Sequence, residues 1–322
     1  MNRFEAFKIL SQGRETEEGL TPDPHASGLK LALSATPFIL YGPPGTGKSR
    51  TVDLILKSLE DMQKLGRLET IQFHRKFSYE DFIEGYKPFE SGFIPKEGIF
   101  KKFCREVSDP DLIDVFVIDE INRADLASTF GEALYALEDR DARTVTTAHL
   151  QESFSIPRNL LIIGTMNTAD RSIANVDFAV RRRFKFLPVF PNKDDLRKWL
   201  MLFDWDIEEF SLDGYCDFAE RLNSRISQHP MLGYHMQLGN SLFVPNASTQ
   251  VLTIASLCEN FCQAILPQLE AYVGLGNRDG LAQLTNPPVA DAFLKYHFVQ
   301  ESALAGHIRE SSSDKSTLSS SD

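Results

Sequence analysis

The chain has 322 residues, of which 42% are hydrophobic and 25% charged, and its formal net charge is −11 at pH 7. This composition is typical of a folded globular protein, and the sequence has no apolar run of the roughly 18 residues that a membrane-spanning helix needs. The first thirty residues mix acidic and basic side chains, which fits neither a secretory leader nor a transit peptide, so we expect a cytoplasmic protein without a membrane partner.

Four short apolar runs, rich in β-branched and aromatic residues, predict buried strands, and residues 186–189 are a weaker fifth candidate. Segments with apolar residues at helical spacing, such as 52–62 and 130–137, lie between them. Strands that alternate with helices indicate a parallel sheet covered by helices on both faces. The four runs are residues 38–41, 70–73, 115–118 and 160–164.

From about residue 190 onward apolar residues recur every three or four positions, which predicts a smaller helical domain. We expect an N-terminal extension over residues 1–29, an α/β core over 30–190 and the helical domain over 191–309. The tail 310–322 contains seven serines and one leucine, so it is expected to be disordered. Residues 201–322 carry a net charge of −9, which disfavours direct binding of DNA by the chain alone.

A glycine-rich loop links the first predicted strand to a helical pattern and matches G-x-x-x-x-G-K-[ST]. Its glycines allow successive backbone N–H groups to point at an anion, and the following helix adds its positive end. We expect Lys48 to reach the β- and γ-phosphates of a nucleotide and the Ser49 hydroxyl to ligate Mg²⁺. The predicted nucleotide-binding residues are Gly42, Pro43, Pro44, Gly45, Thr46, Gly47, Lys48 and Ser49.

Two acidic residues, Asp119 and Glu120, follow the third predicted strand. The carboxyl ends of parallel strands meet at one edge of a sheet, so both side chains are expected to face the nucleotide. Asp119 would then hold Mg²⁺, while Glu120 would orient and deprotonate the attacking water. Since one carboxylate would suffice for binding, the pair favours hydrolysis.

Asn167 stands at the end of the fourth predicted strand, where a buried amide is costly unless it has hydrogen-bond partners. A γ-phosphate and its attacking water would supply them, so Asn167 is a candidate sensor of the third phosphate. The alternative is a structural Asx turn.

Three consecutive arginines, Arg181, Arg182 and Arg183, follow in a segment (151–200) that carries nine basic and five acidic residues. Successive side chains on a helix fan around its axis by about 100°, so at least one arginine should point away from the local core. Such an arginine can stabilise the transition state in another subunit's site. The alternative is a solvated basic patch.

Taken together, these motifs resemble the AAA+ ring nucleoside triphosphatases and, within them, the McrB family, whose namesake is the GTP-hydrolysing motor of a modification-dependent restriction system. The string Met-Asn-Thr-Ala-Asp-Arg-Ser at residues 166–172 is the most specific likeness. The phosphate loop, Asp-Glu-Ile-Asn-Arg at 119–123 and Asp-Phe-Ala-Val-Arg-Arg-Arg-Phe at 177–184 also agree. The resemblance spans roughly residues 30–275.

The resemblance implies an α/β AAA+ core with a C-terminal helical lid domain, hydrolysis of GTP or ATP with Mg²⁺, and a hexameric ring with nucleotide at the subunit interfaces. It also implies that Asn167 and Asp170 line the catalytic site. Arg182 or Arg183, with Arg123 or Arg171, would complete the site of a neighbouring subunit. In the lid, Asn240 stands where we expect a histidine.

The resemblance further implies partners. A separately encoded nuclease subunit similar to McrC is expected, and DNA would be reached through that subunit or through a separate reader domain. Other interpretations are a nucleotide-gated assembly scaffold, an AAA+ ATPase that remodels a protein partner without DNA restriction, and a metabolic kinase that shares the phosphate loop. The phosphate-binding residues do not read the base, so they leave GTP and ATP open.

Overall fold

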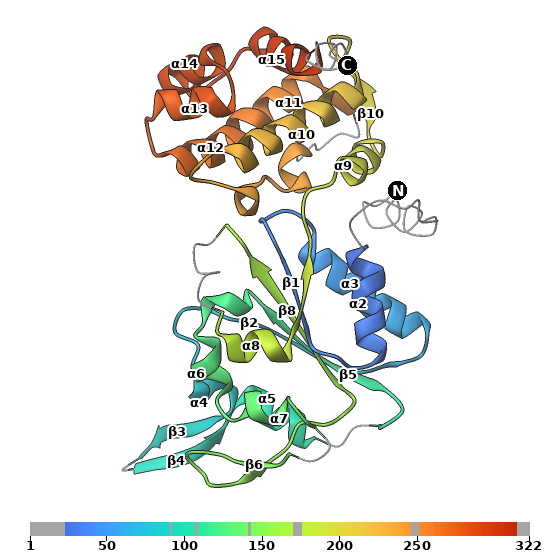
Figure 1. Cartoon of the computed structure of the whole chain (residues 1–322), viewed down its shortest axis with the longest axis vertical. Coiled ribbons are helices and arrows are strands. Elements are labelled where there is room, and N and C mark those ends of the chain that lie inside the picture. Colours follow the sequence, from blue (N-terminus) through green and yellow to red (C-terminus); the bar gives the residue numbers. More distant parts are fainter. Residues whose placement is uncertain are drawn as a thin grey trace, which may run out of the picture. The chain divides into compact units, whose positions relative to one another are not determined.

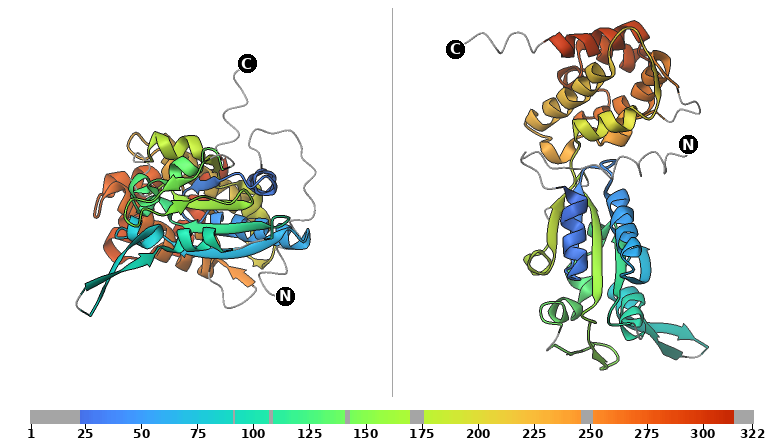
Figure 2. Two further views of the ribbon diagram at one scale, coloured as in Figure 1. Left: turned by 90° about the horizontal axis from the view of Figure 1, so that it is seen from below. Right: turned by 90° about the vertical axis from the view of Figure 1, so that its right-hand side faces the viewer.

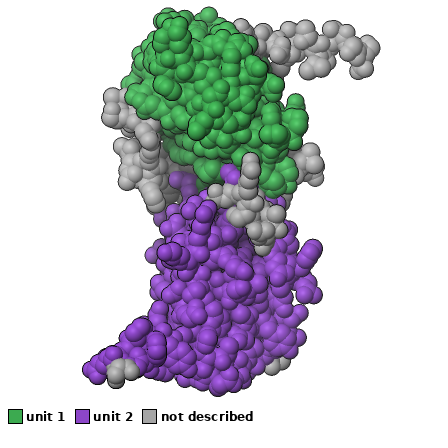
Figure 3. Space-filling model, turned by 90° about the vertical axis from the view of Figure 1, so that its left-hand side faces the viewer, with its two compact units in different colours: residues 1–19, 43–47, 190–322 green, residues 20–42, 48–189 purple. Residues whose placement is uncertain are grey.

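The computed structural model divides the chain into two compact units, coloured separately in Figure 3. Residues 20–42 and 48–189 form one, the α/β unit, and residues 1–19, 43–47 and 190–322 are grouped in the other, the helical unit. The described residues are 23–90, 92–106, 109–140, 143–169, 176–245 and 251–313.

The α/β unit is built on a five-stranded sheet in the order β2-β5-β8-β1-β9 (Figure 1). All four strand pairs are parallel, which confirms the predicted parallel sheet. The four apolar runs and the weaker fifth one each supply one strand. The bounds are β1 (Phe38–Gly42), β2 (Leu65–Gln72), β5 (Ile113–Asp119), β8 (Leu160–Asn167) and β9 (Lys185–Pro188).

Helices cover both faces of this sheet, and alternate residues of each central strand enter opposite cores. On β5, Val115 and Val117 pack in the same core as Ile55 of α3 (Lys48–Asp61). Phe116 and Ile118 join the other core. Helices on that second side are α4 (Tyr79–Phe82), α5 (Ile99–Arg105), α6 (Leu126–Phe130), α7 (Ala133–Ala136) and α8 (Phe178–Arg183).

Helix α2 (Pro24–Leu33) begins inside the stretch expected as an N-terminal extension, and it packs against α3. Gly28 makes the close approach possible, because a Cβ there would lie 2.5 Å from the Cδ1 of Ile55. His25 Nε2 and Ser58 Oγ lie 3.1 Å apart. The α/β unit therefore includes residues before position 30, and residues 1–22 lie outside the described ranges.

Two hairpins extend the unit beyond the predicted elements. Strands β3 (Glu84–Phe89) and β4 (Gly92–Glu97) form a ribbon that projects from the α/β unit in Figures 1 and 2, and β6 (Val145–Thr146) pairs with β7 (Ser153–Phe154). Prolines at positions 88 and 95 interrupt the first ribbon's strand pattern. Proline has no backbone N–H to donate to a neighbouring strand, so a sequence segment that contains proline is not readily predicted as a strand.

A buried ion pair joins the bases of these hairpins. Lys101 of α5 pairs with Glu84, and both side chains are fully buried. The other oxygen of Glu84 accepts hydrogen bonds from the backbone N–H groups of His149 (3.0 Å) and Leu150 (2.7 Å), in the loop between β6 and β7. Lys101 also pairs with Glu152 at 2.8 Å. Removing Lys101 would leave the Glu84 carboxylate buried without a counter-charge, so the pair stabilises the junction of the two hairpins.

The helical unit consists mainly of helices, in agreement with the predicted C-terminal helical domain. It also contains a short two-stranded parallel sheet of β10 (Asp204–Asp206) and β11 (Val251–Thr253) that the sequence patterns did not indicate. The last helix, α15, continues to Ser313, so residues 310–313 of the Ser-rich tail are helical, and 314–322 lie outside the described ranges. The helices are α9 (Lys193–Leu200), α10 (Leu212–Gln228), α11 (Ile254–Asn260), α12 (Leu266–Val273), α13 (Arg278–Leu284), α14 (Pro287–Tyr296) and α15 (Glu301–Ser313).

Two buried asparagines hold the loop that follows α10. The Asn223 amide donates to the carbonyl of Leu238 at 2.9 Å and accepts from its N–H at 2.7 Å. Asn240 donates to the carbonyl of Asn192 at 2.9 Å. These bonds satisfy amides that would otherwise be costly to bury, so both residues stabilise the unit's own loops.

Within the described ranges, no helix combines the length and the apolarity needed to cross a bilayer.

His307 gives the helical unit a predicted dependence on pH. The ring packs edge-on against Phe218, and no described residue partners its Nε2 atom. Burial, with a smaller effect of Arg225, lowers the pKa of His307 to about 4. An unfolded histidine titrates near 6.5, so between pH 6.5 and 4 the unfolded chain binds the proton more strongly, and stability falls as the pH falls.

We expect the free energy of unfolding to be about 2 kcal/mol lower at pH 5 than at pH 7.5 because of this one residue. Urea titrations at both pH values measure it. The His307→Phe variant keeps an aromatic ring against Phe218 and lacks the proton site, so its unfolding should lose that part of the pH dependence. Equal pH dependence in both proteins would contradict the assignment.

Candidate functional site

The loop between β1 and α3 has the backbone that anion binding requires. Gly45 and Gly47 have φ angles of +77° and +94°, a backbone conformation that residues with a side chain rarely adopt. The Thr46 hydroxyl donates to the carbonyl of Pro43 at 3.0 Å and braces the turn. Helix α3, 14 residues long, begins directly after the loop, at Lys48. The backbone N–H groups of the loop and the positive end of helix α3 thus lie together.

Lys48 is a buried cation near two carboxylates. Its side chain is 7% exposed, and its Nζ donates to the carbonyl of Gly42 at 3.0 Å. Burial lowers the pKa of Lys48 to about 8, while the charges of Glu120 and Asp119 raise it in part. Desolvation of the ammonium thus outweighs the effect of the two carboxylates. Negative charge from a bound polyphosphate would favour the charged form of Lys48.

The sheet topology brings the predicted residues to one edge. Strand β8 lies between β5 and β1, with Gly42 paired to Asn167 and Ile118 paired to Gly164. Because these strands are parallel, their carboxyl ends lie side by side. The start of the phosphate loop, the Asp119-Glu120 pair and Asn167 therefore share this edge.

Asp119 is held by both of its carboxylate oxygens. The Thr165 hydroxyl donates to Oδ1 at 2.5 Å, and the Gln72 side-chain amide donates to Oδ2 at 3.2 Å. The same Thr165 oxygen accepts the backbone N–H of Glu120 at 3.2 Å. Thr165 is not among the predicted site residues. The available signal was a hydroxyl within an otherwise apolar strand.

Glu120 is positioned by neighbours on both oxygens. The Asn167 amide donates to its Oε1, and Arg123 Nε lies 3.3 Å from its Oε2 as an ion-pair partner. Oε2 is buried, and no donor within the described ranges makes a hydrogen bond to it. A buried acceptor of this kind is a place for an ordered water or a polar ligand. Asn167 therefore acts on the carboxylate rather than closing an Asx turn.

The donor chemistry at this edge suits Mg²⁺ bound together with a substrate. Nowhere in the described parts of the chain do three or more His, Cys, Asp or Glu side chains gather to hold a metal. Mg²⁺ does not need such a cage, because it keeps several waters and takes one or two protein oxygens plus substrate phosphates. The Ser49 hydroxyl and the Asp119 carboxylate are oxygen donors of the required kind.

The Arg183 side chain makes all its observed contacts within its own chain. Its Nε donates to the carbonyl of Leu134 at 2.7 Å and one terminal nitrogen to that of Ala179 at 2.8 Å. The other terminal nitrogen pairs with Glu138 at 3.3 Å, and the side chain is only 11% exposed. These contacts tie α8 to the α7 region, which is a structural role.

The other two arginines of the triplet differ from each other. Arg181 donates to the carbonyl of Val176 at 3.1 Å, and its guanidinium lies 5.7 Å from the ring centre of Phe186. Arg182 is exposed and makes neither a hydrogen bond nor an ion pair with any residue that the structure describes. Phe178, four residues earlier and thus on the same side of the helix, is 81% exposed. Helix α8 therefore presents Arg182 and Phe178 outward.

Of the remaining predicted residues, the structure describes Arg123. It contacts Glu120 and lines a cleft of about 560 Å³ formed by residues 122–128, Val176 and Asp177. Asp170 and Arg171 lie outside the described residues, between Ala169 and Val176.

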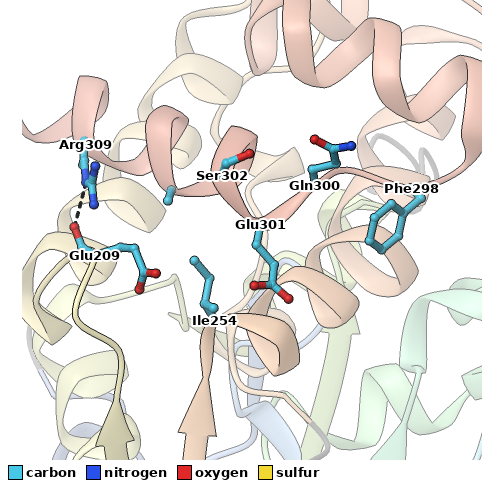
Figure 4. A pocket seen from close by; sticks show the side chains of 8 residues that line it. Glu209, Ile254, Phe298, Gln300, Glu301, Ser302 and Arg309 are labelled. Atoms are coloured by element: carbon cyan, nitrogen blue, oxygen red, sulfur yellow. Dashed lines mark hydrogen bonds between the residues drawn. The ribbon is translucent and has the colours of Figure 1, made fainter.

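The helical unit contains a second cleft of about 560 Å³, shown in Figure 4. Glu209 and Glu301 place two carboxylates at its rim, and Arg309 Nε donates to the carbonyl of Glu209 at 2.7 Å. None of the predicted phosphate-binding residues lines it. Two carboxylates and one guanidinium line this cleft, and the excess of negative charge disfavours an anionic ligand such as a nucleotide.

Known proteins resemble the chain over this region. Residues 37–184 match the AAA domain of the dynein-related subfamily. The EcoKMcrB subunit of a type IV methyl-directed restriction enzyme from Escherichia coli strain K12 is 39% identical over 215 residues, which cover 64% of this chain and 47% of that protein. YdiS, a component of the type II restriction enzyme BsuMI from Bacillus subtilis strain 168, is 28% identical over 192 residues, covering 46% of this chain and 55% of that protein. The chain spans about half the length of these curated relatives.

Proposed function

Because the chain belongs to the McrB family of AAA+ nucleoside triphosphatases, we propose that it binds GTP or ATP and hydrolyses the γ-phosphate, as the motor subunit of a restriction complex. One observation carries this proposal: Glu120, held by Asn167, lies at the sheet edge where the phosphate loop begins and close enough to raise the pKa of Lys48. The helical unit would serve as the lid domain.

Each proposed role follows from an atom at this edge. The backbone N–H groups of residues 45–49 and the ammonium of Lys48 would bind the phosphates. Ser49 and Asp119 would hold Mg²⁺, which supplies positive charge at the β- and γ-phosphate oxygens when bound. Glu120 would take the proton of the attacking water, and Asn167 would keep that carboxylate in place. Asp170 is proposed to line the same site.

We propose a hexameric ring in which Arg182 of one copy reaches the γ-phosphate bound by the next. Its exposure and the absence of bonds to described residues support Arg182 over Arg183, which is anchored to Leu134 and Ala179. Arg123 and Arg171 would lie near the same interface. Two relatives are named as restriction-enzyme components, which supports an McrC-like nuclease as a partner through which DNA is engaged.

Phosphate release by the purified chain, measured separately with GTP and ATP in the presence of Mg²⁺, tests the proposal. We expect Mg²⁺-dependent turnover with one or both nucleotides, increased by the partner nuclease. The Lys48→Ala variant is the control, because it removes the charge that contacts the phosphates. Nucleotide-dependent assembly without turnover, alone or with the partner, would indicate an assembly scaffold instead.

A further inference from the structure

Thr165 is a polar residue in a strand that is otherwise apolar and buried. Residues 160–166 of β8 are all buried, and Thr165 is 3% exposed. Its hydroxyl has two partners, both on the end of β5: the Asp119 carboxylate at 2.5 Å and the backbone N–H of Glu120 at 3.2 Å. One side chain thus contacts both acidic residues of the site.

The directions of these two hydrogen bonds are fixed by chemistry. An N–H group can only donate, so the bond from Glu120 uses a lone pair of the Thr165 oxygen. The hydroxyl hydrogen is then free for Asp119 Oδ1, which accepts it as a carboxylate. A valine in its place could make neither bond. The arrangement therefore holds the Asp119 side chain in a single orientation.

Thr165 also supports an unusual backbone conformation. Glu120 has a φ of +53°, in the left-handed region that residues with side chains seldom adopt. Such a conformation persists where its surroundings hold it, and the bond from the Glu120 N–H to Thr165 is one such constraint. The strand behind it is tightly packed, since a Cβ on Gly164 would lie 2.9 Å from the Cδ1 of Ile121. Thr165 therefore acts from a well-packed position on β8.

We propose that Thr165 is a positioning residue for the hydrolysis described above, and this inference rests on that proposed function. Its hydroxyl sets the orientation of the Asp119 carboxylate, which would hold Mg²⁺, and fixes the turn at Glu120. Gln72 contacts the other Asp119 oxygen from an exposed position, so it is the weaker constraint. Thr165 does not touch the substrate in this scheme and acts only through the two acidic residues.

The test compares Thr165→Val, which keeps the shape and removes the hydroxyl, with Thr165→Ser, which keeps the hydroxyl and removes a methyl group. Electron paramagnetic resonance titration of Mn²⁺ against each protein saturated with a non-hydrolysable triphosphate analogue measures the metal site directly. We expect about tenfold weaker Mn²⁺ binding for Thr165→Val, as is usual when a partner of a metal ligand is lost. Thr165→Ser should stay within about twofold of the unchanged chain.

A double-mutant cycle separates positioning from general damage. If Thr165 acts through Asp119, the valine substitution should weaken Mn²⁺ binding little further in an Asp119→Asn background. Three results would overturn the proposal. The valine substitution could weaken Mn²⁺ binding as much in the Asp119→Asn background as in the unchanged chain, it could leave Mn²⁺ binding of the otherwise unchanged chain intact, or valine and serine could weaken Mn²⁺ binding equally. If circular dichroism shows that Thr165→Val is unfolded, Thr165→Ala against Thr165→Ser makes the same comparison. A chain that binds Mn²⁺ and nucleotide but hydrolyses neither GTP nor ATP would refute the proposed function and leave this test intact.

Discussion

The Glu120→Gln variant is expected to bind nucleoside triphosphate as the unchanged chain does and to hydrolyse it at least about a hundredfold more slowly. Glutamine has nearly the same shape as glutamate, and its carbonyl oxygen can still accept the hydrogen bond that Asn167 donates to Oε1. The amide cannot take a proton from water. The substitution therefore removes the general base with little change in packing.

Two measurements separate binding from chemistry in this variant. Fluorescence titration with a labelled triphosphate analogue gives affinity, and single-turnover phosphate release gives the rate of hydrolysis. Glu106→Gln is the matched control, because Glu106 is a surface residue that pairs with Arg67 away from the site. A loss of less than about tenfold in the Glu120→Gln variant would mean that another group activates the water.

The central sheet could be predicted because its signals are local in the sequence. A parallel strand buried on both faces is a short continuous run of apolar residues, as in β5 and β8. The phosphate loop is equally local, since its glycines, lysine and serine occupy eight consecutive positions. Parallel topology then places Asp119 and Asn167 at one edge, and the register bears this out.

Other features depend on contacts between residues far apart in the chain, and the sequence patterns did not reveal them. The β3–β4 hairpin is anchored by the ion pair of Glu84 and Lys101. From the sequence alone, charged residues are expected at the surface, but the fold buries these two side chains together. Thr165 acquires its role only when β8 lies beside β5. Hydrophobic periodicity does not report which polar side chains will meet.

The arginine triplet shows the same limit from another side. Helical geometry predicts that the three side chains fan apart, but it does not say which of them meets a partner. The backbone carbonyls of Leu134 and Ala179 accept hydrogen bonds from Arg183, and the carbonyl of Val176 accepts one from Arg181. These acceptors belong to the surrounding fold. Arg182 remains as the arginine available to a second copy.

Arg182→Ala is the second variant with a large expected effect. Because Arg182 bonds to no residue in the described ranges, its removal should leave the thermal stability of the chain nearly unchanged. Turnover should fall by about a thousandfold or more, the range in which an arginine supplied by a neighbouring molecule contributes to phosphoryl transfer. Arg183→Ala is the contrasting control, expected to lower the melting temperature because three contacts are lost.

Mixing two inactive variants tests whether the arginine acts between copies. In a ring formed from equal amounts of Glu120→Gln and Arg182→Ala chains, roughly a quarter of the interfaces pair an intact Glu120 with an intact Arg182. Those interfaces should hydrolyse nucleotide although neither variant does so alone. Complementation would require exchange of subunits before nucleotide is added. A mixture that exchanges subunits and stays inactive would place Arg182 in the site of its own chain, or outside the reaction.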